Sequence, residues 1–388
     1  MYINFWYPIA QSENVVKYEP YQTQVLGQQL VAFRDSKGKA HVLSDVCIHR
    51  GGALGKGWVR ENSVVCPYHG WQFGGDGKCN KIPTVETKKI PNRAKVDSYP
   101  VQEKYGIVFA FLGDLPEKQR PPLRPVNEWG RKGWRANDKV VEFEVNAYYE
   151  RSIENGLDPS HNEFVHPAQG SPILQDAFKQ KPLDMQDSRW GSEFLVRFDN
   201  KMTETRALND EAQAVDEVTA GSGFVGPNQM ITWISFSKKQ RFTQYFYEAP
   251  IDKNRTRIFF VNMRNFMLAP ENDGRLVKVN LSIAKEDIDI LEALDPVGTP
   301  NSTAEELLVP SDAAVMSYRK YLQSWRDKGW YIDTDTISTE RHNRTFAIPS
   351  PDRRKSKGWV LNAVPLLPPT KKGKKKSKKK SKKKRKAA

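Results

Sequence analysis

Two short pairs of cysteine and histidine lie near the start of the chain and could carry out redox chemistry. The pairs are Cys47-x-His49 and Cys66-x-x-His69, and sixteen residues separate the two pairs. Two thiolates and two imidazoles at this spacing can hold a [2Fe-2S] cluster, with both cysteines on one iron and both histidines on the other. Replacing two anionic thiolates with neutral imidazoles raises the reduction potential above that of an all-cysteine cluster. The four residues therefore predict a site that accepts and relays electrons.

A zinc site of two cysteines and two histidines uses the same ligand types and is the alternative. Zinc ribbons and fingers usually open with two cysteines, whereas here each pair joins one cysteine to one histidine. Gly51 and Gly52 follow the first pair and Gly70 follows the second, and these glycines predict two tight loops over the metal. The order of the ligands favours the cluster over zinc.

A second group of candidate ligands lies in the stretch that begins at Glu154. It contains Asp158, Pro159, His161 and His166. Five residues turn an α-helix by about 140°, so the two histidines cannot share one face of a regular helix. Pro159 predicts an interruption of the helix. With the interruption the two imidazoles can converge, and without it they cannot.

A third ligand can come from a predicted helix at Arg275–Leu294. At about 100° per residue, Asp287 lies at the centre of the apolar face of this helix and Glu286 lies at its margin. A carboxylate that faces a protein core is costly unless it is paired or binds a metal. We therefore predict that Asp287 is a metal ligand, and a buried ion pair is the alternative. Two imidazoles and one carboxylate form the facial triad of non-haem Fe(II) oxygenases, which leaves coordination positions open for dioxygen.

The elements that must position these residues follow two patterns. Up to residue 115, short apolar runs such as Ile107–Leu112 alternate with turn residues, which predicts an all-β unit. A proline- and charge-rich stretch, Leu115–Pro125, predicts a linker. Long alternating runs between residues 193 and 266 predict an antiparallel sheet with one face packed on helices. The predicted fold class is α+β.

The domain division that we predict is 1–115, 116–350 and 351–388. The net charge of +15 arises mainly at the end of the chain, because residues 371–388 contain thirteen Lys or Arg and no acid, which leaves +2 for residues 1–370. A run of like charge without a hydrophobic core predicts a disordered, solvated tail. The alternative is weak electrostatic contact of this tail with a polyanion.

The composition also indicates the cellular compartment of the protein. No run approaches the roughly eighteen apolar residues of a membrane span, and the start of the chain lacks the basic region of a secretory signal. Three cysteines, two of them expected on the cluster, argue against a disulfide scaffold and for a reducing compartment. We therefore predict a cytoplasmic protein.

Taken together, the motifs resemble the α (terminal oxygenase) subunit of Rieske non-haem iron aromatic-ring-hydroxylating oxygenases. The resemblance covers about residues 5–325 and is greatest to the single-subunit type, such as vanillate demethylase, ketosteroid hydroxylase and the pheophorbide oxygenase-like group. The residues that carry it are Trp6-Tyr7-Pro8, Cys47-x-His49, Arg50-Gly51, Cys66-x-x-His69, Tyr68-His69-Gly70-Trp71, Asp158-x-x-His161-x₄-His166 and Glu286-Asp287.

The resemblance implies a β-rich Rieske [2Fe-2S] domain followed by a helix-grip (START-like) catalytic domain with a large antiparallel sheet. It implies one Rieske cluster and one mononuclear Fe(II). The implied cluster ligands are Cys47, His49, Cys66 and His69, and the implied iron ligands are His161, His166 and Asp287. It also implies a head-to-tail homotrimer, in which Asp158 accepts hydrogen bonds from His161 and from the partner subunit's His69. Electrons would then cross from cluster to iron through Asp158.

The resemblance also implies the activity. Electrons from NAD(P)H pass through a separate reductase or ferredoxin to the cluster and then to the iron, where O₂ is activated. The substrate is a small apolar or aromatic compound that is hydroxylated or oxidatively demethylated. Two alternatives are a pure electron-transfer module, which needs only the cluster ligands, and a ligand-binding protein, which does not need the iron ligands.

Overall fold

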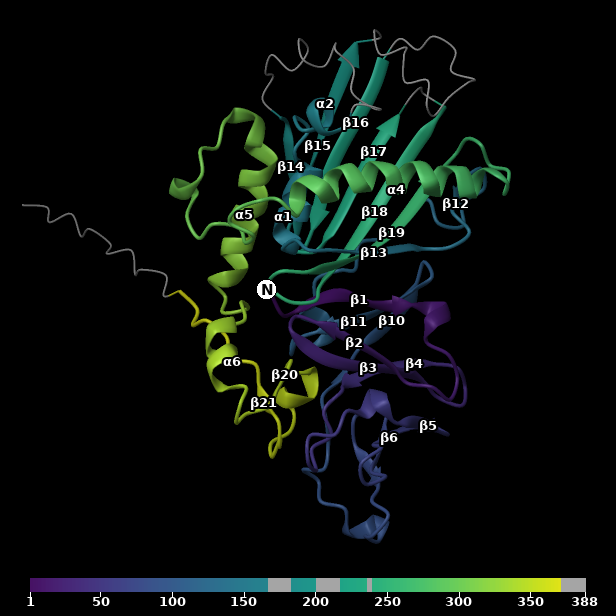
Figure 1. Cartoon of the computed structure of the whole chain (residues 1–388), viewed down its shortest axis with the longest axis vertical. Coiled ribbons are helices and arrows are strands. Elements are labelled where there is room, and N and C mark those ends of the chain that lie inside the picture. The colour runs from purple at the N-terminus through teal and green to yellow at the C-terminus, as the bar shows by residue number, and fades with distance from the viewer. Residues whose placement is uncertain (167–182, 200–216, 236–238, 371–388) are drawn as a thin grey trace, which may run out of the picture.

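The structure is a computed structural model of the chain. It describes residues 1–166, 183–199, 217–235 and 239–370. Two β-rich halves lie one above the other along the long axis, with strands β1 to β11 in the lower half and the long helix α4 in the upper half (Figure 1). The lysine-rich tail predicted to be disordered, residues 371–388, lies outside the described residues.

The lower half consists of three small antiparallel sheets. Their strand orders are β2-β3-β4-β9, β5-β6-β7-β8 and β1-β11-β10. Strand β11 lies between β1 and β10, and all of its residues are buried, which explains its unbroken apolar sequence. The strands are β1 (Phe5–Gln11), β2 (Tyr21–Val25), β3 (Gln28–Arg34), β4 (Ala40–Ser44), β5 (Trp58–Arg60), β6 (Ser63–Val65), β7 (Gln72–Gly74), β8 (Cys79–Lys81), β9 (Ser98–Tyr99), β10 (Val101–Lys104) and β11 (Ile107–Leu112). The all-β prediction for this part is confirmed.

The upper half is built on one large antiparallel sheet. Its strand order is β12-β19-β18-β17-β16-β15-β14, and β13 also pairs with β19. The strands are β12 (Arg135–Ala136), β13 (Val141–Val145), β14 (Met185–Asp187), β15 (Gly191–Asp199), β16 (Glu217–Val225), β17 (Gln229–Ser235), β18 (Arg241–Pro250) and β19 (Thr256–Arg264). The predicted antiparallel sheet, and with it the α+β class, is confirmed.

Strand β18 shows how this sheet separates its two faces. Gln244 and Phe246 lie toward the helices, where they line a cavity together with residues of α4. Tyr245 lies on the opposite face, because side chains alternate along a strand, and its hydroxyl donates a hydrogen bond of 2.6 Å to Glu128 Oε2. One face of the sheet therefore packs on the chain that follows the predicted linker, and the other is left for a site.

One long helix crosses the sheet (Figure 1). The helices are α1 (Tyr149–Leu157), α2 (Asn162–Val165), α4 (Asn272–Leu291), α5 (Ala313–Arg326) and α6 (Thr334–Glu340). Helix α4 begins and ends three residues earlier than predicted. Its earlier start has a physical reason, since the Asp273 carboxylate in its first turn pairs with Arg135 and Arg264 and acidic groups stabilise helix N-termini.

The predicted helix around the two histidines is interrupted, as Pro159 indicated. Helix α1 ends at Leu157, and the next helical turn, α2, begins only at Asn162. Asp158 Oδ1 accepts a hydrogen bond of 2.7 Å from the Ser160 amide, which stabilises the turn between the two helices. The break frees His161 and His166 from the 140° separation that a continuous helix would impose.

The last described segment returns to the lower half and packs beside it (Figure 1). Strands β20 (Phe346–Ala347) and β21 (Asn362–Ala363) form a short parallel pair there. Asp97 of the lower half is fully buried and accepts hydrogen bonds from Ser350 Oγ at 2.9 Å and from Arg353 Nη2 at 2.7 Å. These contacts anchor the C-terminal segment to the lower half.

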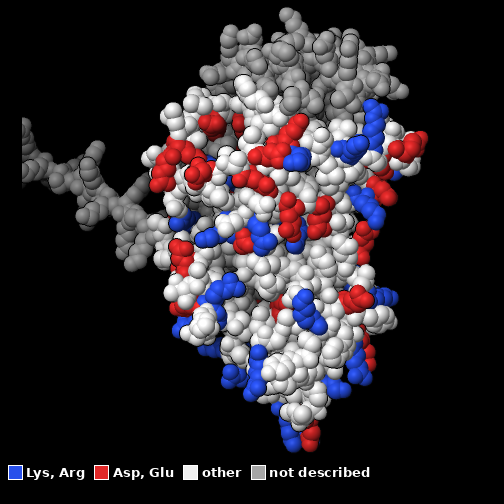
Figure 2. Space-filling model, viewed as in Figure 1, with Lys and Arg blue, Asp and Glu red and all other residues white. Residues whose placement is uncertain are grey.

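The surface carries both signs of charge. Figure 2 shows acidic and basic side chains interspersed over the face that α4 crosses, which agrees with the small net charge predicted for residues 1–370. None of the described helices is long and apolar enough to cross a membrane.

Candidate metal centres

The two Cys/His pairs lie on two loops of similar construction in the lower half. In each loop a glycine amide donates a hydrogen bond of 2.9 Å to the cysteine carbonyl four residues earlier, from Gly51 to Cys47 and from Gly70 to Cys66. Both glycines have a positive φ, of 74° and 69° respectively. Such a backbone conformation favours glycine, so these two residues allow the loops to turn tightly. The predicted tight loops are therefore present.

The side chains of the two loops pair like with like. The rings of His49 and His69 have centroids 4.4 Å apart. The thiols of Cys47 and Cys66 are buried. Burial, with the neighbouring Cys66 thiol as a further cause, raises the pKa of the Cys47 thiol to about 12. Two thiols on one side and two imidazoles on the other are the arrangement that a [2Fe-2S] cluster of this ligand type requires.

The histidine side of this site lies at the surface. His49 and His69 are both exposed. The ring of His49 stacks on Trp71, with centroids 4.6 Å apart and planes inclined by 8°, and the ring of Tyr68 lies 3.9 Å from that of His69. The aromatic neighbours hold both imidazoles in place while their outer edges remain accessible to a partner.

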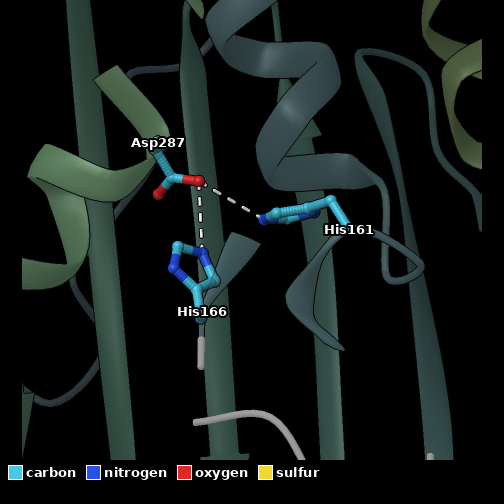
Figure 3. A group of neighbouring side chains, drawn as sticks. All are labelled: His161, His166 and Asp287. Carbon is cyan, nitrogen blue, oxygen red and sulfur yellow. Dashed lines mark ion pairs between the residues drawn. The ribbon is translucent and has the colours of Figure 1, made fainter. Parts of the chain in front are cut away.

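The second centre joins residues from three elements in the upper half. His161 follows the break after α1, His166 follows α2, and Asp287 lies in the last turns of α4 (Figure 3). Asp287 Oδ1 lies 3.5 Å from His161 Nε2 and 3.2 Å from His166 Nε2. One ligand atom from each residue lies within 4.8 Å of the others, a spacing that suits a single metal ion. The structure brings together all three predicted iron ligands.

Hydrogen bonds on the far side of each ring orient the two imidazoles. His161 Nδ1 lies 2.6 Å from the carbonyl oxygen of Asp158, and His166 Nδ1 lies 2.9 Å from Glu286 Oε2. Each Nδ1 therefore donates its hydrogen outward, and each Nε2 lies on the Asp287 side, where it would be a ligand of a bound metal. Metal-bound histidines are commonly held in this way by a carbonyl or a carboxylate.

Electrostatics also suit a cation at this centre. Burial alone would raise the pKa of Asp287, but the hydrogen bonds of His161 and His166 outweigh it and hold this pKa well below its usual range. Asn155 Nδ2 donates a further hydrogen bond of 2.9 Å to Asp287 Oδ1. Burial alone would lower the pKa of His166, but Asp287 and Glu286 raise it. The centre therefore carries negative charge that a metal ion can neutralise.

Asp158 lies next to this centre, but its contact with His161 differs from the one expected. The ring of His161 bonds the backbone carbonyl of Asp158, and the Asp158 carboxylate accepts the Ser160 amide in the turn after α1. Asp158 still lines the cavity beside the three ligands.

A mostly apolar cavity of about 270 Å³ opens beside the three ligands, between α1, α4 and the sheet. Phe194, Trp233 and Phe260 line it, whereas Trp190, Tyr245 and Phe259 do not. Tyr245 and Phe259 lie on the other face of their strands, because side chains alternate along a strand, and they point away from α4.

Two contributors to the centre were not predicted. Helical periodicity places Glu286 only at the margin of the apolar face of α4, yet its carboxylate holds His166. The sequence predicts no role for Asn155, yet its side chain holds Asp287. The sequence carries no local signal for this contact, because it joins α1 to α4 across 132 positions.

Two family models match the chain. The Rieske [2Fe-2S] domain matches residues 5–100, and the vanillate O-demethylase oxygenase C-terminal domain matches residues 145–328. The first range contains both Cys/His pairs, and the second contains the centre at His161, His166 and Asp287. The order of the two matches is the order predicted from the motifs.

The chain is similar to methylxanthine N1-demethylase NdmA of Pseudomonas putida, with 26% identity over 337 residues, which cover 84% of this chain and 89% of that protein. It is also similar to the oxygenase component of 3-ketosteroid-9-alpha-monooxygenase of Mycolicibacterium smegmatis, with 28% identity over 240 residues, 60% of this chain and 58% of that protein. The solved structure of Pseudomonas putida CBB5 NdmA with caffeine has the same fold, with a TM-score of 0.66 and 24% identity over 82% of this chain and 90% of that one.

These matches confirm the predicted family, enzyme class and cofactors. The relatives are oxygenases, and the family combines a Rieske cluster with a mononuclear iron and works with O₂ and a reductase or ferredoxin. The chain therefore belongs to the Rieske non-haem iron oxygenases and is a terminal oxygenase of that type.

Proposed function

We propose that this oxygenase binds its mononuclear Fe(II) at His161, His166 and Asp287 and hydroxylates or oxidatively demethylates a small apolar or aromatic compound. The observation that supports it is the convergence of these three side chains on the wall of the cavity of about 270 Å³. Two imidazoles and one carboxylate suit Fe(II), which when bound there would supply the reductive activation of O₂.

The surrounding residues have distinct parts in this proposal. Asp158 and Glu286 hold the two imidazoles by their Nδ1 hydrogens, so that both Nε2 atoms stay unprotonated and directed at the metal. Asn155 holds Asp287 from the side of α1. The apolar wall of the cavity excludes water from the reacting carbon and positions the substrate.

The cluster is assigned to Cys47, His49, Cys66 and His69. The like-with-like pairing of these side chains and the exposure of the two histidines support this assignment. The electrons are proposed to come from an NAD(P)H-dependent reductase. We propose a head-to-tail homotrimer in which Asp158, whose backbone carbonyl contacts His161, bridges His161 and the partner subunit's His69.

The substrate range is proposed from the relatives. One relative is a methylxanthine N1-demethylase and another is a component of a ketosteroid monooxygenase, and both names imply oxidation of a ring compound or of its methyl group. We also propose that residues 1–115 form the cluster domain and residues 116–350 the catalytic domain, and that the protein works in the cytoplasm.

An iron assay on Asp287→Ala tests the assignment. The wild-type chain is expected to hold one iron beyond the two of the cluster after anaerobic loading with Fe(II). Asp287→Ala is expected to lose that iron and all product formation while the visible spectrum of the cluster stays unchanged. Asp289→Ala is the matched control, because Asp289 lies on the exposed side of α4 in an ion pair with Lys285. Full iron retention and turnover in Asp287→Ala would refute the assignment.

A further inference from the structure

Polar side chains form a row on the sheet face that α4 covers. Thr232 of β17 lies directly opposite Gln244 of β18, and Gln244 lies directly opposite Asn262 of β19. Residues opposite one another on neighbouring strands point to the same face. Asn280 of α4 reaches the same place, with its Oδ1 3.5 Å from Gln244 Nε2. We call Thr232, Gln244, Asn262 and Asn280 the amide row.

The row closes one end of the cavity. Thr232, Gln244 and Asn280 line the cavity directly. Asn262 does not line this cavity and borders a second one. On β19 it lies between Phe260, which lines the first cavity, and Arg264, which pairs with Asp273 at the start of α4. These three residues of β19 share one face because they are two positions apart.

The hydrogen bonds of the row are incomplete. Thr232 Oγ1 donates a bond of 2.8 Å to Gln244 Oε1, and Gln244 Nε2 continues the chain to Asn280. Asn280 Nδ2 has no hydrogen-bond partner among the described residues, although Asn280 is only 8% exposed. A buried amide group without a partner is unfavourable, so the row offers this donor to an incoming polar group. The Gln244 oxygen beside it accepts only the Thr232 hydroxyl and has a second lone pair for an incoming donor.

The distance from the amide row to the iron ligands limits the length of a substrate that carries such a polar group. Asn280 and Asp287 are seven residues apart on α4, which places them on the same face and about 10 Å apart along the helix axis. This is about the length of two fused rings with a contact at each end. The wall between them is apolar and partly aromatic, with Phe246 and Trp233 in it, which suits a planar ring system.

We infer that the amide row recognises a neutral hydrogen-bonding group of the substrate, a ring lactam or imide, while the far end of a two-ring substrate lies at Asp287. This inference rests on the proposed function and specifies its substrate class. Amide side chains offer donors and an acceptor but no full charge, so they match a lactam better than a carboxylate. A purely hydrocarbon end would leave the row unpaired, which is the penalty that polar sites use to reject apolar analogues.

The inference is tested by anaerobic calorimetry of the iron-loaded protein with three probes of one shape: 2-quinolinone, naphthalene and 2-naphthoate. 2-Quinolinone is expected to bind tightest. Asn280→Leu and Gln244→Leu are each expected to weaken its binding by about tenfold and to leave naphthalene binding unchanged or tighter. Lys278→Leu, at an exposed position of α4, is the matched control.

The other outcomes overturn the inference. Equal 2-quinolinone affinity in both leucine variants would mean that the row holds only water. Preference for 2-naphthoate would mean an anionic substrate, and no binding of any probe would refute the two-ring class. If a leucine variant fails to fold, Thr232→Val and Gln244→Glu test the same row. Because binding needs no turnover, a protein that binds 2-quinolinone through the row but takes up no O₂ would refute the proposed function alone.

Discussion

At the scale of the residue, the two histidines of the iron centre depend on different kinds of partner. His161 is oriented by the backbone carbonyl of Asp158, which no side-chain substitution removes. His166 is oriented by the carboxylate of Glu286, which also adds negative charge and raises the basicity of the imidazole. A substitution of Glu286 can therefore change the orientation of the His166 ring, whereas a substitution of the Asp158 side chain leaves the hydrogen bond that orients His161.

We predict that Glu286→Gln weakens iron binding by about tenfold, because the amide oxygen keeps the hydrogen bond to His166 but loses the charge. Glu286→Ala, which loses both, should weaken it further. Iron retained after dialysis against a graded series of chelator concentrations measures the effect, with the cluster spectrum as the internal reference. Equal retention in wild type and both variants would contradict a role for Glu286.

A second prediction concerns Glu248, a fully buried carboxyl on β18. Ser152 Oγ donates a hydrogen bond of 2.7 Å to its Oε1, and burial raises its pKa from 4.5 to about 8. Because the folded-state pKa is the higher one, the contribution of Glu248 to stability is full below pH 4.5 and is lost as the pH rises through about 8. Glu248→Gln should therefore be more stable than wild type at about pH 8 and not at about pH 4.5.

Denaturant midpoints between about pH 4.5 and about pH 8.5 measure this difference. The glutamine side chain in the variant keeps an oxygen for Ser152 and cannot ionise, so the midpoint of the variant should fall less with pH than that of the wild type. Parallel curves for the two proteins would show that Glu248 is ionised in the folded state throughout this range.

At the scale of the element, helical periodicity and a single proline predicted most of the iron centre. The apolar face of α4 singled out Asp287, and Pro159 indicated the break that lets His161 and His166 converge. The contact of Glu286 with His166 could not be predicted, because it depends on where the chain lies after α2. That position is set by tertiary packing and not by local pattern.

The amide row illustrates the same limit in the sheet. Thr232, Gln244 and Asn262 each interrupt an alternating apolar strand at an inward position, and this signal is present in the sequence. Their alignment across three strands depends on register, which the turns between the strands determine. Single polar residues could therefore be seen in advance, but not the row that they form.

We predict that Asp273→Ala loosens the anchored end of α4. Asp273 accepts from Arg135 Nε at 2.9 Å and pairs with Arg264, which is only 1% exposed. Removing the carboxylate leaves a buried guanidinium without its counter-charge, which costs about 3–5 kcal/mol. Urea unfolding should show this loss, and Arg264→Met combined with Asp273→Leu should recover much of it. A single variant as stable as the wild type would show that the pair does not anchor the helix.

At the scale of the whole molecule, the sequence predicted two successive halves but not the return of the C-terminal segment to the lower half. The short runs and turns of the lower half and the long strands of the upper half differ visibly in pattern. The return of the C-terminal segment to the lower half depends on one buried carboxylate, Asp97, and on Arg353, which lies 256 positions later. Nothing local to either residue indicates that contact.

We predict that Arg353→Ala destabilises this docking, because it leaves Asp97 buried without its cation, at a cost of about 3–5 kcal/mol. The C-terminal segment should become sensitive to limited proteolysis, and the visible absorbance of the cluster should be lost at a lower temperature. Arg354→Ala is the control, since Arg354 is half exposed and pairs at the surface with Asp114. Identical proteolysis of the two variants would refute the anchoring role of Asp97 and Arg353.

The exposure of His49 and His69 affects how many of the electrons supplied to the protein end in product. With a cluster held by these residues, an electron would leave it through the exposed imidazole edges, where dissolved dioxygen would compete with a protein acceptor for it. A neighbouring chain bound over these edges would exclude dioxygen from them and would also accept the electron. The fraction of electrons that ends in product would then be a property of assembly, and dilution would lower it without altering a single residue of either metal centre.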